Sequence, residues 1–178
     1  MEFIRLNVPL LDQEELDEIN GVLKSGFLTQ GPKVAEFEDI IREYVGSKYA
    51  FATSSATTAL HLAAVALNIQ PGDEVLVADF TFPATANIVI QQGAIPVPVD
   101  IDIDTFTMNI DDLKSKITSK SKAIIPVDAF GLCCDVKNID KVAKEHGLPV
   151  IQDSACSLGS TYDDQMVGQL ATATCFSF

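Results

Sequence analysis

The sequence has few basic residues and no long apolar run, and each shortage excludes a class of protein. Lysine and arginine number 12 against 25 aspartate and glutamate residues, giving a net charge of -13. So acidic a chain disfavours nucleic acid and anionic membranes as partners, although a helix N-terminus can still bind a small phosphate. No apolar stretch approaches the roughly 20 residues of a membrane span. Residues 1–5 lack the pattern of a signal peptide, so we expect a cytoplasmic protein.

The cysteines are also few, and their spacing argues against a metal site. The sequence has four of them, and no pair shows the C-x-x-C spacing typical of zinc sites. Cys133 and Cys134 are adjacent and therefore poor disulfide partners. We predict reduced thiols and no bound metal.

The remaining composition is that of a globular domain. Hydrophobic residues make up 47% and charged residues 21% of the 178 positions, enough for one domain with a core. Two helices are predicted first, one capped by Asp12 and ended by Gly26, the other begun by Gly31-Pro32 and ended by Gly46. Predicted strands follow at 48–53, 74–78, 95–100, 123–127, 149–152 and 173–178. Predicted helices lie at 57–69, between Pro83 and Gly93, at 111–117 and at 136–146.

This alternation of strands and helices predicts an α/β fold. Such a chain forms a mainly parallel sheet with helices on both faces. We expect residues 1–46 to form an N-terminal helical segment and residues 47–178 to form the ligand-binding large domain. Ligands of these sheets bind beyond the carboxyl ends of the strands, so the residues that follow each strand are the candidates for chemistry.

Hydroxyl residues follow the first predicted strand and begin the next helix. Thr57 and Thr58 close a run of small residues that starts at Thr53. Hydroxyls, backbone N–H groups and the helix dipole together suit a phosphate. The same residues are more often ordinary helix caps, so the pattern alone favours capping and leaves a phosphate site as the alternative.

Two other strand ends carry residues suited to a flat, cationic ring. Phe82 could cover the face of a heteroaromatic ring, or it could belong to the core. Asp153 could pair with a protonated pyridine nitrogen, or it could cap the following loop. Asp128 is a second candidate, although a turn residue before Gly131 is the simpler interpretation. A phosphate cradle, a ring cover and a pyridinium partner are together what pyridoxal phosphate requires.

Several blocks of the sequence are similar to a known family. Residues 31–38 read GPKVAEFE, residues 54–62 read SSATTALHL and residues 79–87 read DFTFPATAN. Further along, residues 153–159 read DSACSLG and residues 175–178 read CFSF. These blocks, in this order, resemble the DegT/DnrJ/EryC1/StrS family of sugar aminotransferases across essentially the whole chain.

The resemblance implies a fold, an activity and a set of contacts. The fold would be the large domain of pyridoxal-phosphate enzymes of fold type I, incomplete here. Members mostly move an amino group from glutamate to a nucleotide-linked keto-sugar and work as homodimers. Cys156 stands where relatives commonly carry Gln or His near the cofactor, so the chain departs from the family at this ring contact. By position, the implied cofactor-binding residues are Thr57, Thr58, Phe82, Asp153, Cys156 and Ser177.

The same resemblance implies a Schiff-base lysine a few residues after the Phe-Ser-Phe block, hence beyond Phe178. We assign no catalytic residue within residues 1–178. A few relatives carry histidine in place of that lysine and deoxygenate sugars, so a dehydratase of the same family stays open. A non-catalytic fragment that pairs with a complete subunit also stays open. A nucleotide-binding module of an oxidoreductase is disfavoured, because no G-x-G-x-x-G follows the first strand.

Overall fold

A five-stranded parallel arrangement forms the centre of the computed structural model, which describes residue 4 and residues 8–178. Strand β1 (Glu74–Ala78) pairs in parallel with β2 (Ile95–Val99) on one side and β3 (Ser121–Ile125) on the other. Strand β4 (Ile151–Asp153) pairs in parallel with β7 (Ala173–Cys175). Parallel bridges from Ile124 to Val150 and from Val127 to Asp153 join β3 to β4. The predicted parallel sheet is confirmed, with the spatial order β2-β1-β3-β4-β7.

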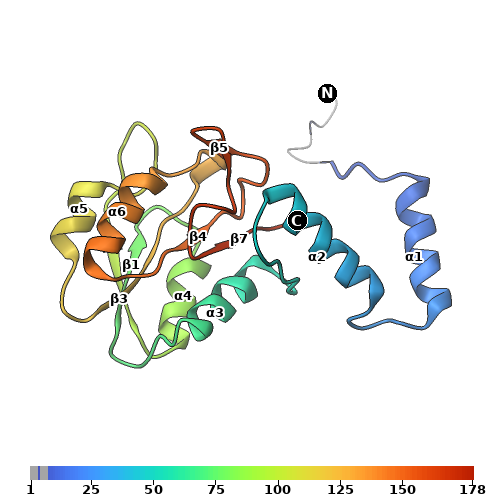
Figure 1. Cartoon of the computed structure of the whole chain (residues 1–178), viewed down its shortest axis with the longest axis horizontal. Coiled ribbons are helices and arrows are strands. Elements are labelled where there is room, and N and C mark those ends of the chain that lie inside the picture. Colours follow the sequence, from blue (N-terminus) through green and yellow to red (C-terminus); the bar gives the residue numbers. More distant parts are fainter. Residues whose placement is uncertain (1–3, 5–7) are drawn as a thin grey trace.

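Helices cover both faces of this sheet, as predicted (Figure 1). One core layer packs α3 (Ala56–Ala66) and α4 (Ala84–Gln91) against Val75 and Val77 of β1. The other packs α5 (Ile110–Lys116) and α6 (Val136–His146) against Leu76 and Ala78. Successive residues of a strand point to opposite faces, so the continuous apolar run of β1 fills both layers.

Two helices precede the sheet and have the ends that the sequence predicts. Asp12 forms a capping box at the start of α1 (Gln13–Ser25), and Gly26 ends it at φ 76°. Gly31 and Pro32 begin α2 (Pro32–Val45), which Gly46 ends at φ 70°. Glycine adopts this left-handed conformation without steric cost. In Figure 1, α1 lies apart from the sheet, and α2 lies between α1 and the sheet.

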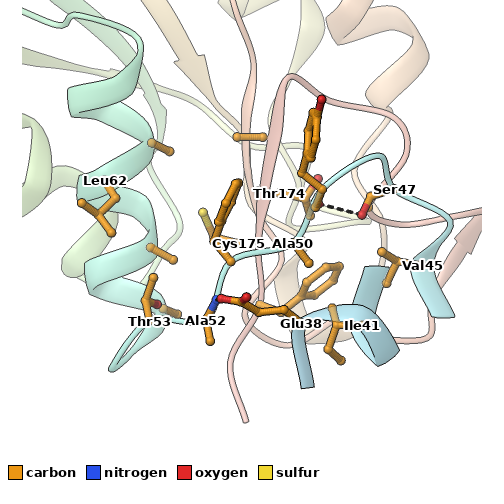
Figure 2. Close-up of a pocket in the computed structure, with 18 of the residues that line it drawn as sticks. Glu38, Ile41, Val45, Ser47, Ala50, Ala52, Thr53, Leu62, Thr174 and Cys175 are labelled. Atoms are coloured by element: carbon orange, nitrogen blue, oxygen red, sulfur yellow. Dashed lines mark hydrogen bonds between the residues drawn. The ribbon is translucent and has the colours of Figure 1, made fainter. Parts of the chain in front are cut away.

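The predicted strand at 48–53 is wrong. Its backbone amide at Ala52 donates to the Glu38 carboxylate of α2 at 2.8 Å, and the segment joins no ladder. A groove of about 1010 Å³ separates residues 46–56 from residues 168–178, which include the edge strand β7 (Figure 2). A strand needs a hydrogen-bonded neighbour, and this segment faces the groove instead.

Other boundaries differ from the sequence prediction by a few residues. The strand predicted at 173–178 ends at Cys175, and the helix predicted at 57–69 ends at Ala66. A short hairpin of β5 (Thr161–Tyr162) and β6 (Gln165–Met166) was not predicted. Its two turn residues are aspartates at positive φ rather than the glycines that usually mark such a turn. Among the described residues, every helix is too short or too polar to cross a membrane.

Candidate active site

Asp153 ends β4 at the carboxyl edge of the sheet, and the residue is 5% exposed. The hydroxyl of Thr85, in the first turn of α4, donates to Asp153 Oδ2 at 2.7 Å. The amide of Ala155 donates to Oδ1 at 3.3 Å. None of the ion pairs within residue 4 and residues 8–178 includes Asp153. The site therefore holds a buried acid with two neutral donors.

Burial raises the pKa of the Asp153 carboxyl above its ordinary value, and the charge of Asp128 raises it further. The hydrogen bonds from Thr85 and Ala155 act in the opposite direction and lower it. A cation that binds beside this buried carboxylate would stabilise its ionised form, because a nearby opposite charge favours ionisation. This is the environment that a protonated ring nitrogen requires.

Thr85 also connects Asp153 to the loop that carries Phe82. Its backbone amide donates to the Phe82 carbonyl at 3.2 Å, and the hydroxyls of Thr81 and Thr85 lie 2.7 Å apart. The Phe82 ring is 75% exposed, so a core position for it is excluded. The structure thus brings Phe82 and Asp153 to one edge through a threonine that lies between them.

The start of α3 carries the hydroxyls predicted for a phosphate. The Ser55 hydroxyl accepts from the backbone amide of Thr58 at 3.2 Å, so helix capping does occur here. Thr58 Oγ1 lies 3.1 Å from the Ser54 hydroxyl and 3.0 Å from that of Ser55. Thr57 is exposed. Side-chain hydroxyls thus cluster at an exposed N-terminus of an 11-residue helix, which also packs against β4 and β7.

The last two predicted residues lie next to these groups. Asp153 is in register with Cys175, and the Ser154 amide donates to the Cys175 carbonyl at 2.9 Å. Ser177 follows β7 and lines the same groove as Ser54 and Ser55. Cys156 is exposed in the turn that follows Asp153. The structure thus links Phe82 to Asp153 through Thr85, places Cys156 in the turn after Asp153, and places Ser177 in one groove with the serines that precede Thr57 and Thr58.

Sequence reasoning missed Thr85, and for Asp128, its second candidate, it preferred the role of a turn residue. Thr85 is fully buried, and a threonine in an otherwise apolar helix start was the signal available for it. Asp128 does precede the short 3-10 turn η1 (Ala129–Gly131), but its side chain is buried and accepts hydrogen bonds from the segment 152–157. The turn is therefore only part of its role.

The residues at this edge fit pyridoxal phosphate. A helix N-terminus with hydroxyl donors suits its phosphate, and an exposed phenylalanine ring suits its planar face. The buried Asp153 carboxylate has no cationic partner among the described residues and suits a protonated nitrogen.

Known proteins share both this fold and this sequence. Spr1654 from Streptococcus pneumoniae, which is assigned as a sugar aminotransferase, has a solved structure similar to this one. The TM-score is 0.95 and the sequence identity is 37%, and the match covers 98% of this chain and 48% of Spr1654. It has been solved in apo, pyridoxamine phosphate and pyridoxal phosphate forms. The fold is that of pyridoxal-phosphate-dependent aminotransferases of fold type I.

Within that class, the chain belongs to the DegT/DnrJ/EryC1/StrS aminotransferase family, whose sequence model matches residues 9–178. SpsC, a spore coat polysaccharide biosynthesis protein of Bacillus subtilis, is 43% identical over 176 residues, which are 99% of this chain and 45% of SpsC. A UDP-2-acetamido-2-deoxy-3-oxo-D-glucuronate aminotransferase of Pseudomonas aeruginosa is 41% identical over 180 residues, 100% of this chain and 50% of the relative. The chain thus spans about half the length of these relatives.

Proposed function

We propose that the protein is a pyridoxal-phosphate-dependent aminotransferase that moves an amino group from an amino acid, glutamate, to a nucleotide-linked keto-sugar. The buried Asp153 carboxylate, held by Thr85 beside the Phe82 loop, is the observation that carries the proposal. The P. aeruginosa relative, named for a UDP-linked 3-oxo sugar acid, supports the substrate class. Residues 47–178 would form the cofactor-binding domain, with residues 1–46 as its helical extension.

Each residue of the site would have one task. Asp153 would hold a proton on the ring nitrogen, and Thr85 would keep the carboxylate in place. Thr57, Thr58 and Ser177 would bind the phosphate at the start of α3, where the helix dipole favours an anion. When bound, the cofactor supplies an electron sink for bond changes at the amino-bearing carbon. Phe82 would cover the ring, and Cys156 would lie beside it.

A binding experiment tests this proposal first. The protein as its gene encodes it should gain thermal stability with pyridoxal phosphate and not with NAD, because a ligand of the folded state stabilises it. Asp153→Asn should reduce this gain strongly. Asp140→Asn is the matched control, because Asp140 pairs with Lys144 on α6 away from the site. A response to NAD alone would instead favour the oxidoreductase module.

Turnover is the second test. Incubation with glutamate and a UDP-linked keto-sugar should yield 2-oxoglutarate and an amino-sugar, and Asp153→Asn should slow the reaction at least a hundredfold, a magnitude consistent with loss of a transition-state interaction. Release of a dehydrated sugar without 2-oxoglutarate would favour the dehydratase instead. No product with cofactor bound would favour a non-catalytic partner.

We also propose that the protein works as a homodimer in the cytoplasm. Helix α1 buries none of its own residues and exposes Leu16, Ile19 and Leu23, which recur at helical spacing on one face. An apolar face of this kind is typical of a surface that another chain covers. The four described cysteines are free, which suits a reducing compartment. Analytical ultracentrifugation tests the dimer, and Leu16→Glu with Leu23→Glu should shift it to monomer.

A further inference from the structure

A second aspartate, Asp128, is buried next to Asp153 and takes no part in the proposed chemistry. It ends the segment after β3 and is 1% exposed. Its backbone amide donates to the Asp153 carbonyl at 3.0 Å, so the two residues lie on neighbouring segments. A buried carboxylate without a counter-ion is costly unless hydrogen bonds satisfy it. Its partners therefore show what it does.

Four groups donate to the Asp128 carboxylate. The hydroxyls of Ser154 and Ser157 each donate to Oδ2 at 2.7 Å. The side-chain amide of Gln152 lies 3.0 and 3.1 Å from the two oxygens, and the Cys134 amide donates to Oδ1 at 3.0 Å. An ionised carboxylate offers about four acceptor sites, so this one is fully occupied.

This occupancy argues against a metal at the same place. The thiols of Cys133 and Cys134 and one Asp128 oxygen lie within 4.8 Å of one another, which is a possible ligand group. A metal would have to displace donors from a carboxylate that is already saturated. Asp128 is therefore an acceptor for the protein itself.

Three of the four donors come from one short segment. Gln152 precedes Asp153, whereas Ser154 and Ser157 follow it and flank the exposed Cys156. The Ser157 amide donates to the Ser154 carbonyl at 3.0 Å, which closes a turn. Both serines are fully buried beneath this turn. The Asp128 carboxylate thus holds the turn through its buried serines, whereas Asp153 begins the turn and Cys156 lies on its exposed side.

We propose that Asp128 is a positioning residue that fixes the turn 153–157 and thereby the Asp153 carboxylate toward the cofactor. The part of this proposal that concerns the cofactor rests on the proposed function. Asparagine at position 128 keeps the shape but turns one acceptor into a donor, so it cannot accept from both serines and Gln152. Ser157→Ala removes a single donor and leaves the carboxylate in place.

Two measurements on the protein as its gene encodes it test the proposal. Hydrogen exchange without cofactor should show at least a tenfold loss of protection at the amides of Ala155 and Ser157 in Asp128→Asn, and a smaller loss in Ser157→Ala. Affinity for pyridoxamine phosphate, which binds without a covalent bond, should fall about tenfold in Asp128→Asn. Ser115→Ala is the control and should change neither, because the Ser115 hydroxyl donates to the backbone carbonyl of Asp112 on α5 at 2.8 Å, away from this turn.

A double-mutant cycle separates positioning from general loss of stability. If Asp128 acts through Asp153, Asp128→Asn should weaken pyridoxamine phosphate binding little further when Asp153→Asn is already present. Fully additive effects would overturn the proposal, as would unchanged exchange at Ala155 and Ser157. If Asp128→Asn does not fold, Ser154→Ala and Ser157→Ala carry the same cycle.

The outcomes also separate this proposal from the proposed function. Wild-type protein that fails to bind pyridoxamine phosphate would overturn the proposed function and the cofactor part of the inference. A loss of protection at Ala155 and Ser157 would still support Asp128 as the anchor of the turn in that case. Loss of protection with unchanged affinity in a protein that does bind would overturn the positioning role.

Discussion

The hydrogen bond from Thr85 to Asp153 yields the sharpest stability prediction. Thr85→Val keeps the shape of the side chain and removes the hydroxyl that donates to Oδ2 at 2.7 Å between two buried residues. A hydrogen bond to a charged group contributes about 1.5–3 kcal/mol. In this variant the Thr81 hydroxyl can still donate to the Phe82 carbonyl at 3.3 Å, so the lost contact between Thr81 and residue 85 adds little to the destabilisation. We expect a loss of about 2 kcal/mol in the free energy of unfolding at neutral pH.

This loss should depend on pH with a definite sign. Burial raises the pKa of Asp153 above its ordinary 3.8, so the stability linked to this group is full below 3.8 and is lost as the pH rises through the raised pKa. The Thr85 hydrogen bond lowers that pKa, so removing it raises the pKa further and deepens the loss. The gap between wild type and variant should therefore widen as the pH rises through that window.

Urea unfolding of the cofactor-free protein at a series of pH values measures this gap. Thr107→Val is the control, because Thr107 is buried and its hydroxyl pairs with that of Thr105 at 2.9 Å, with no carboxylate involved. It should cost about 1 kcal/mol at every pH, the usual value for a neutral pair. An equal, pH-independent loss in both variants would refute the reasoning about Asp153.

Three further predictions concern single contacts. Asp153→Asn should raise the melting temperature of the cofactor-free protein at neutral pH, since it removes a carboxylate whose pKa burial raises, and the gain should vanish below pH 3.8; a lower melting temperature at neutral pH would contradict this. Glu38→Gln weakens the acceptor for the Ala52 amide, so exchange of that amide should accelerate about tenfold while amides inside α6 stay unchanged. The hydrogen bond to Asp135 raises the pKa of Tyr162 from 10.0 to about 12. The stability linked to this tyrosine is therefore full below pH 10.0 and is lost as the pH rises through about 12. In an ultraviolet titration, Asp135→Asn should move the midpoint of Tyr162 down toward 10.0.

Much of the fold could be predicted from local signals. Asp12 and Gly26, and likewise Pro32 and Gly46, mark helix ends through backbone conformation and capping alone. The apolar runs of β1 and β3 indicate buried parallel strands because both of their faces are covered. These features depend on residues close in sequence, so no tertiary information is needed.

The segment 48–53 shows where local signals end. Its residues have strand character, but a strand also requires a neighbour along its edge. Here the Ala52 amide meets the Glu38 carboxylate, 14 positions earlier, and a groove lies between the segment and β7. The hairpin of β5 and β6 was not predicted, because its two turn residues are aspartates and the glycine that usually marks such a turn is absent there.

The candidate site likewise combines features that the sequence indicates locally with contacts between distant residues. Strand ends pointed to Phe82 and Asp153 in the sequence, but the link between them in the structure is Thr85, which lies 68 positions before Asp153. Asp128 and Asp153 look alike in the sequence, since each follows an apolar strand. Their difference lies in the donors: two hydroxyls and two amides occupy Asp128, whereas one hydroxyl and one amide reach Asp153. Of these two aspartates, only Asp153 therefore keeps free acceptor capacity for a cation. The donors that make this difference reach the two carboxylates only when the chain folds.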